Sequence, residues 1–234
     1  DLVGVSLSSK IGKACYIPIG HKSNKCIEKD LVLKKLKPLL EDPSIKKIGQ
    51  NIKFDFIVFF KHGINMTSME DTMLMSYVLD AGKNRHNMDT LSEIHLNHKT
   101  ISFKDLVGTG KKEINFSEVD VEKAKDYAAE DADITFRLYK KFQKSLKDEK
   151  MINIYEIFEK PLLKILAFME IEGVKIDNKF LKSLSTKFEK KIVKIQNEVF
   201  KISKKEFNIA SPKQLGEILY NDLKIADLKK TKKG

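Results

Sequence analysis

The sequence predicts an α/β domain over residues 1–150, followed by an all-helical segment over residues 151–234. Two β-rich apolar runs open the chain at 2–8 and 14–19. Helical patterns then dominate, interrupted by one further strand-like run at 45–49, and from residue 153 onward there is little strand signal. The change in character near residue 150 predicts a domain boundary there.

Each element of the first domain has a local signal. The first two runs are separated by a short polar stretch and predict a hairpin of adjacent strands. The amphipathic pattern at 28–41 predicts a helix with an apolar face of Leu31, Leu36, Leu39 and Leu40. Further helices are predicted at 53–61, ending at His62-Gly63, and at 71–79, 88–96 and 121–147. The stretch from 103, with Gly108 and Gly110, predicts looser structure.

The second segment shows three helical patterns. The first, at 154–172, is closed by Gly173, and the extended link 174–177 leads into the second, at 179–204. Apolar residues recur along this second helix with a helical period and predict one buried face: Leu181, Leu184, Phe188, Ile192, Ile195 and Val199. Ser211-Pro212 predicts the N-cap and first residue of a third helix, reaching about Asp222.

Composition and charge restrict the class of protein. The chain has 234 residues, 41% of them hydrophobic, and a net charge of +11. Residues 151–234 hold 18 of the 44 basic and 11 of the 33 acidic groups, which favours a phosphate-rich partner for this part. The alternative explanation is that the excess of lysine reflects an AT-rich genome, because only Arg85 and Arg137 are arginines. No apolar run reaches the roughly 20 residues of a membrane span, and Cys15 and Cys26 predict neither disulfide nor zinc site.

Acidic and phenolic residues indicate a metal-dependent nuclease site. Tyr127 and Asp131 lie four residues apart in a helical run, so both face the same side of the helix. Asp55 follows the strand-like run that ends at Gly49. Hard divalent ions prefer carboxylate oxygens, and such ions activate water. The alternatives are that Asp55 is only a helix cap, and that Glu130 and Asp133 are solvated neighbours or supporting groups.

Several motifs together resemble a known family. Gly49-Gln50-Asn51-x-Lys53-x-Asp55 and Tyr127-x-x-x-Asp131 resemble the second and third motifs of the proofreading 3′–5′ exonuclease domain of family A DNA polymerases, a DnaQ-like group. Blocks similar to bacterial polymerases of this family lie between them and beyond residue 150. They are Asp71-Thr72-Met73, Arg85-His86-x-Met88-Asp89-x-Leu91, His98-Lys99-Thr100-Ile101-x-Phe103, Glu172-Gly173-Val174-Lys175-Ile176-Asp177 and Ser211-x-Lys213-Gln214-Leu215.

The resemblance implies a fold and a chemistry. The fold is a ribonuclease-H-like, DnaQ-type mixed sheet flanked by helices, followed by the helical start of a polymerase thumb. The implied cofactors are two divalent ions, Mg²⁺ or Mn²⁺, about 4 Å apart. They would be held by Asp55 and Asp131, with the Tyr127 hydroxyl orienting the attacking water.

The resemblance also implies the substrate contacts. Gln50, Asn51 and Arg85 would hold a frayed strand, and Phe103 would offer an apolar surface to a terminal base. The implied partners are the single-stranded 3′ end of DNA, primer-template duplex and the rest of a polymerase polypeptide, with no membrane.

One departure from the family concerns the first motif, an Asp-x-Glu on the first strand. Nothing in the opening segment of this sequence resembles it. We therefore expect the first strand to be missing, and this segment alone to be inactive. Two alternatives remain: a non-catalytic, degenerate exonuclease module that binds nucleic acid, and a stand-alone exonuclease similar to ribonuclease D.

The Lys-rich, Trp-free composition resembles plastid (apicoplast) polymerases of malaria-type parasites, which implies a plastid location. An intracellular location is the general expectation.

Overall fold

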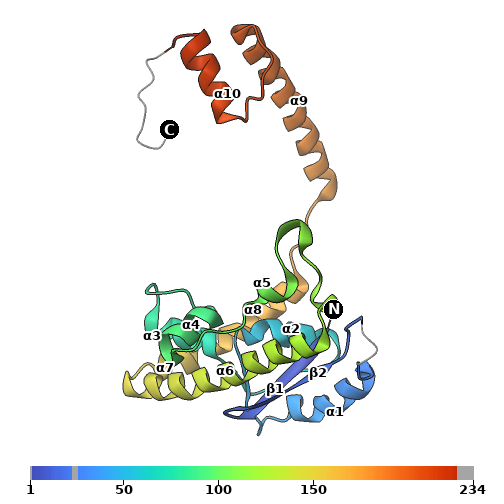
Figure 1. Cartoon of the computed structure of the whole chain (residues 1–234), viewed down its shortest axis with the longest axis vertical. Helices are drawn as coiled ribbons and strands as arrows, with labels where there is room; N and C mark the ends of the chain where they lie inside the picture. Colours follow the sequence, from blue (N-terminus) through green and yellow to red (C-terminus); the bar gives the residue numbers. More distant parts are fainter. Residues whose placement is uncertain (1, 23–25, 226–234) are drawn as a thin grey trace. The chain divides into compact units, whose positions relative to one another are not determined.

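The computed structural model describes residues 2–22 and 26–225, and its contacts divide the chain into two compact units, Asp1–Gly173 and Val174–Gly234 (Figure 1). By contacts, the first unit includes two helices beyond residue 150, α7 (Ile152–Ile154) and α8 (Lys160–Glu172). The boundary between these units follows Gly173, and the predicted boundary near residue 150, which rests on the change in sequence pattern, stays a prediction.

The predicted hairpin is confirmed. Strands β1 (Gly4–Lys10) and β2 (Lys13–Pro18) pair antiparallel, with Val5 opposite Ile17. The turn between them needs a positive φ at Gly12, a conformation that glycine adopts without a steric penalty. The Gly12 N–H donates to Asp133 Oδ1 at 2.6 Å, so the tip of the hairpin is tied to helix α6 (Val121–Asp148).

A second pair of strands lies deeper in the same unit. Strands β3 (Lys47–Gly49) and β4 (Met69–Asp71) run parallel, with Gly49 opposite Asp71. The sequence predicts β3 but not β4, because Glu70 and Asp71 carry no strand signal. The described strands thus form two two-stranded sheets, one antiparallel and one parallel. Both orientations expected of a mixed sheet are present.

Helices surround these strands. Their bounds follow the predicted ones closely. Helix α6 contacts strands of both sheets, and Figure 1 shows it beside β1 and β2. Besides α6, the helices up to residue 107 are α1 (Lys29–Glu41), α2 (Ile52–Lys61), α3 (Thr72–Asp80), α4 (Met88–Leu96) and α5 (Phe103–Val107). Two 3₁₀ turns follow, Gly110–Lys112 and Phe116–Glu118. Residues 103–107 are therefore helical, where the sequence predicts looser structure.

The predicted apolar face of α1 is wrong in part. Leu36 and Leu40 are buried, together with Val32 and Leu33, whereas Leu31 and Leu39 are exposed. Residues 32, 36 and 40 lie along one line of the helix, and one residue corresponds to a rotation of about 100°. Leu31 and Leu39 are displaced to one side of that line and face solvent, whereas Leu33 is displaced to the other side and is buried.

Helix α8 packs directly on α2. A π-helical segment, Tyr155–Glu159, joins α7 to α8, and Gly173 ends α8 as the sequence predicts. The Phe168 ring meets the rings of Phe56 and Phe60 edge-on, at centroid distances of 5.8 and 5.4 Å. Lys53 at the start of α2 forms an ion pair with Glu170. Helix α8 therefore supports the segment that carries Asp55.

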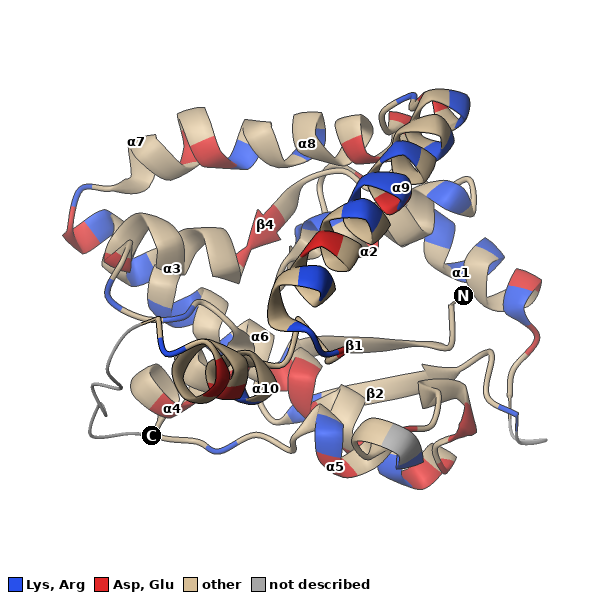
Figure 2. Ribbon diagram, turned by 90° about the horizontal axis from the view of Figure 1, so that it is seen from above, with Lys and Arg blue, Asp and Glu red and all other residues tan. Residues whose placement is uncertain are grey.

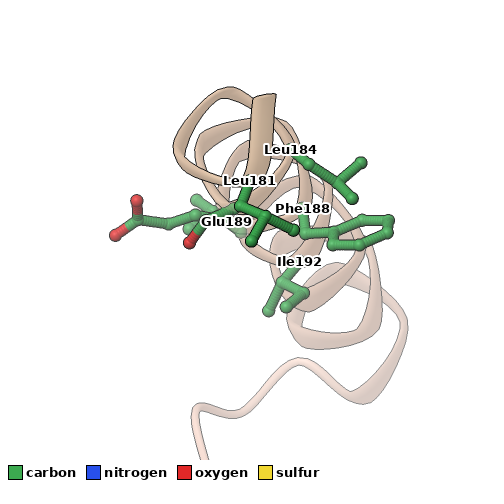
Figure 3. A pocket seen from close by; sticks show the side chains of 7 residues that line it. Leu181, Leu184, Phe188, Glu189 and Ile192 are labelled. Carbon is green, nitrogen blue, oxygen red and sulfur yellow. The ribbon is translucent and has the colours of Figure 1, made fainter. Parts of the chain in front are cut away.

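The regular secondary structure of the second unit is entirely helical over its described residues. Helix α9 (Asn178–Ser203) is capped by Asp177, and α10 (Pro212–Gly216) begins at Ser211 as predicted and continues as a π-helical segment, Glu217–Asp222. The predicted burial of one α9 face is wrong, because Ile192 is 61% exposed. Four residues of this face line a shallow groove of about 450 Å³ (Figure 3): Leu181, Leu184, Phe188 and Ile192. Near the C-terminal end of α9, the Phe200 ring meets the Phe207 ring at a centroid distance of 5.9 Å.

Over the part of the chain that the structure describes, we find no helix with the length and apolar character of a membrane span.

Candidate functional site

Helix α6 brings Tyr127 and Asp131 together. Asp120 caps the helix by accepting from Glu122 N at 3.0 Å, and the two side chains lie one turn apart on the same face. Burial raises the pKa of Asp131 to about 7; Tyr127 lowers it, and Glu130 and Asp89 raise it. Burial and the Asp131 charge raise the pKa of Tyr127, so the phenol stays neutral.

One oxygen of Asp131 has an unusual environment. Oδ1 is buried and has no hydrogen-bond partner among the described residues. Buried carboxylate oxygens are ordinarily paired, because an uncompensated one loses its interactions with water. An oxygen of this kind fits a cation ligand, which agrees with the metal site that the sequence predicts.

Asp55 lies in the first turn of α2, directly after β3. The connection from β3 to α2 is tight. A Cβ at Gly49 would come within 2.7 Å of the Ile52 Cβ, and Asn51 adopts a left-handed conformation with φ of 58°. The Asp55 side chain keeps solvent access, but protein atoms displace much of the bulk water near its carboxylate. This loss of hydration is the main reason that the pKa of Asp55 is raised to about 6. The Asp71 charge adds to the rise.

Asp71 is the residue that sequence reasoning missed. It is 1% exposed and accepts from the backbone N–H groups of Asn51, Ile52 and Met73, at 3.1, 2.9 and 2.8 Å. In Figure 2 the colour of acidic residues marks strand β4, which contains Glu70 and Asp71. The signal was present in the Asp71-Thr72-Met73 block, which reads as an N-cap, but the contact with α2 was not visible in the sequence.

The residues expected to contact a DNA strand differ in how firmly the protein holds their side chains. Gln50 is held on both sides of its amide: Nε2 donates to the His86 carbonyl at 2.7 Å, and Thr72 Oγ1 donates to Oε1 at 2.5 Å. This fastens the loop that carries Arg85 to the end of β3. Asn51 and Arg85 themselves are exposed.

Phe103 belongs to an aromatic cluster beside Tyr127. Its ring stacks on Phe116 at 5.8 Å and lies 5.9 Å from the Tyr127 ring, while 46% of the residue remains exposed. An exposed ring supported from behind is suited to stacking against a base. The role of Phe103 stays a prediction.

Glu130 and Asp133 support the structure around the site. Glu130 Oε1 lies 2.8 Å from His98 Nε2, and Oε2 accepts from Ile101 N at 2.6 Å. Asp133 pairs with Arg137 at 2.7 Å in addition to the Gly12 contact. The sequence leaves open whether Glu130 and Asp133 are solvated neighbours or supporting groups. These contacts favour supporting groups.

The predicted site residues therefore fall into two local groups, one around Tyr127, Asp131 and Phe103 and one around Asp55. Among the described residues, no three His, Cys, Asp or Glu side chains lie together in a way that could hold a metal ion. Asp55 and Asp131 by themselves do not make a complete metal centre.

Comparison with solved structures shows the fold of the chain. The chain resembles the polymerase domain of Pol1 from M. smegmatis in complex with DNA primer-template and dNTP, with a TM-score of 0.68 over 95% of this chain and 35% of that chain, at 22% identity. It also resembles Brucella melitensis NrnC, with a TM-score of 0.56 over 73% of this chain and 76% of that chain, at 23% identity. The expected fold, a mixed α/β domain followed by a helical segment, is confirmed.

The family follows from the sequence itself. Residues 1–147 match the family model described as 3′–5′ exonuclease, and residues 178–234 match that of DNA polymerase family A. The chain belongs to the 3′–5′ exonuclease family found with family A DNA polymerases.

The curated relatives are bacterial. The chain is 40% identical to DNA polymerase I of Rhizobium leguminosarum over its whole length and 25% of that protein, and 39% identical to DNA polymerase I of Pseudomonas aeruginosa, over its whole length and 26% of that protein. The chain thus spans about a quarter of the length of these relatives. The plastid location stays a prediction.

Proposed function

We propose that this chain is the proofreading part of a family A DNA polymerase, hydrolysing the 3′-terminal phosphodiester of single-stranded or frayed DNA. The observation that carries the proposal is the buried, unpartnered Asp131 Oδ1 beside a neutral Tyr127, inside a segment that matches a 3′–5′ exonuclease model. The bacterial relatives named DNA polymerase I support the polymerase context.

Asp131 and Asp55 are the proposed ligands of two divalent ions, Mg²⁺ or Mn²⁺. Bound ions of this kind supply positive charge that favours deprotonation of a water and offsets the charge on the leaving 3′ oxygen. Because no group of three ligands exists among the described residues, the site requires further oxygen ligands besides these two.

Tyr127 is the proposed guide for the attacking water. Its raised pKa keeps the hydroxyl protonated, so it acts as a hydrogen-bonding group and not as a base. Asn51, Arg85 and Phe103 are the proposed strand contacts. Gln50 acts in part through the loop at residues 85–86, because its amide is already bonded to His86 and Thr72.

The test is trimming of a 5′-labelled single-stranded DNA by the complete polymerase polypeptide with Mg²⁺, compared with its Asp131→Asn variant. Loss of a metal ligand should reduce stepwise 3′ trimming at least a hundredfold, while primer extension is unchanged. Asp126→Asn is the matched control, because Asp126 is an exposed acid in the same helix.

Three other results would contradict parts of the proposal. Trimming by Asp131→Asn at the wild-type rate would remove Asp131 from the site. A wild-type enzyme that binds DNA without trimming it would favour the non-catalytic module. Trimming of RNA in preference to DNA would favour a role similar to ribonuclease D.

A further inference from the structure

We infer that Asp71 is a positioning residue that fixes the first turn of α2, and through it the carboxylate of Asp55. The inference deepens the proposed function and rests on it for the role of Asp55. It rests on geometry that stands by itself: one buried carboxylate at the end of β4 serves as the N-terminal cap of two different helices.

The two oxygens of Asp71 together accept hydrogen bonds from the first turns of both helices. Oδ1 accepts from Met73 N at 2.8 Å and Leu74 N at 3.4 Å, which is an ordinary N-cap of its own helix, α3. Oδ2 accepts from Ile52 N at 2.9 Å, and Oδ1 also accepts from Asn51 N at 3.1 Å. These last two groups begin α2, about twenty residues earlier in the chain.

Helix α2 has no cap of its own. Its N-cap residue, Asn51, makes no side-chain capping bond and holds a left-handed conformation. The free N–H groups of a first turn need acceptors, and a buried helix start without them is unfavourable. Asp71 supplies these acceptors from a neighbouring strand, and its negative charge also suits the positive ends of both helix dipoles.

Asp71 is itself held independently of α2. Its backbone N–H donates to the Tyr155 hydroxyl at 2.9 Å, and this hydroxyl donates to Glu70 Oε2 at 3.0 Å. Lys160 then pairs with Glu70 at 2.8 Å. The parallel register places Asp71 opposite Gly49, next to the start of α2. The position of Asp55 is thereby set from β4 and α8 as well as from its own helix.

Two substitutions separate the local cap from the contact between helices. In Asp71→Ser the hydroxyl still caps α3, because serine is a good N-cap. The serine side chain is shorter and has one oxygen, so it cannot replace both carboxylate oxygens at Asn51 and Ile52. In Asp71→Asn the size is kept, but an amide NH₂ faces one of the backbone N–H donors. Asp120→Ser is the matched control, because Asp120 is an exposed cap that serves only α6.

The experiment uses the complete polymerase polypeptide and measures the rate of 3′ trimming against the concentration of Mn²⁺. For Asp71→Ser we expect the half-saturating Mn²⁺ concentration to rise about tenfold, since loss of a group that orients a metal ligand typically costs 10 to 100-fold. Trimming should recover at high Mn²⁺ and primer extension should be unchanged. Melting temperatures measured with chelator show whether each variant is folded at the assay temperature, so that a loss of trimming through unfolding is recognised. An unchanged half-saturating concentration in both Asp71 variants would overturn the inference.

Amide hydrogen exchange provides a readout that does not depend on trimming. Exchange at residues 52–56 should be faster in Asp71→Ser than in the wild type and unchanged in Asp120→Ser, with exchange in the α3 segment little affected. If the wild type fails to trim, the proposed function fails, while faster exchange at 52–56 still supports the positioning role. Equal exchange in the wild type and both Asp71 variants would overturn it. If Asp71→Ser does not fold, Asp71→Asn serves for both measurements.

Discussion

Asp131 and Asp55 hold their protons to higher pH than ordinary aspartates, whose pKa lies near 3.9. Because their folded pKa values are about 7 and about 6, the folded state binds more protons than the unfolded state between pH 4 and pH 7. The stability that these two groups contribute is full below pH 4 and is lost as the pH rises through 6 and 7.

We therefore expect that, with chelator present, Asp55→Asn/Asp131→Asn has a flatter melting temperature profile than the wild type between pH 4 and pH 8. The wild type should lose stability relative to the double variant over that range. Parallel profiles would show that the two carboxyls have ordinary pKa values. In the wild type, Mn²⁺ should raise the melting temperature more at pH 8 than at pH 6, because ligating carboxylates must be deprotonated.

At the scale of single residues, the sequence was informative where contacts are local. Tyr127 and Asp131 are one helical turn apart, so periodicity alone places them on one face. Asp71 could not be assigned in the same way, because two of its bonds go to backbone amides of another helix, which have no side-chain signature. Gln50 is similar: the motif predicts a strand contact, but its bonds to His86 and Thr72 depend on tertiary packing.

At the scale of elements, Glu130 clamps α6 to the segment that leads to Phe103. We expect Glu130→Gln to weaken this clamp, because its amide NH₂ would face either the Ile101 N–H or His98. The KM of the polymerase for single-stranded DNA in trimming should rise severalfold, with a smaller change in kcat.

Glu93→Gln is the control for this prediction, since Glu93 is an exposed acid on α4. If the KM of Glu130→Gln equals that of Glu93→Gln, the segment from His98 to Phe103 does not contribute to holding the strand.

Elements differ in how well a pattern predicts them. Helix α4 begins and ends at the predicted residues, Met88 and Leu96. Strand β4 was not predicted, because three residues with two acids become a strand only through pairing with β3. The apolar period of α9 correctly predicts a helix but not its burial, because period alone does not say whether another element covers the face.

At the scale of the whole chain, the link between the two units is extended and open. Val174 is 89% exposed, and the segment from Val174 to Asp177 has no regular secondary structure. Proteases act preferentially on exposed, extended backbone. We expect limited trypsin treatment to cut after Lys175 before it cuts within the helices of either unit.

Mass spectrometry of the early fragments tests this expectation. Lys175→Gln should remove the first cut and leave later cuts unchanged. Early cleavage at the many lysines of α9, with Lys175 intact, would show that the link is protected in the protein and that the helix is less stable than the link.

The double cap by Asp71 also has a kinetic consequence. The first turn of an ordinary helix frays within its own residues, without disturbing the rest of the molecule. Here the acceptors for the α2 turn belong to β4, which is paired with β3 and bonded to Tyr155. Independent fraying of α2 would leave two carboxylate oxygens buried with fewer donors, so opening of this turn is coupled to opening of the strand pair. The first turn of α2, which carries Asp55, is therefore expected to open only when the β3–β4 strand pair opens as well.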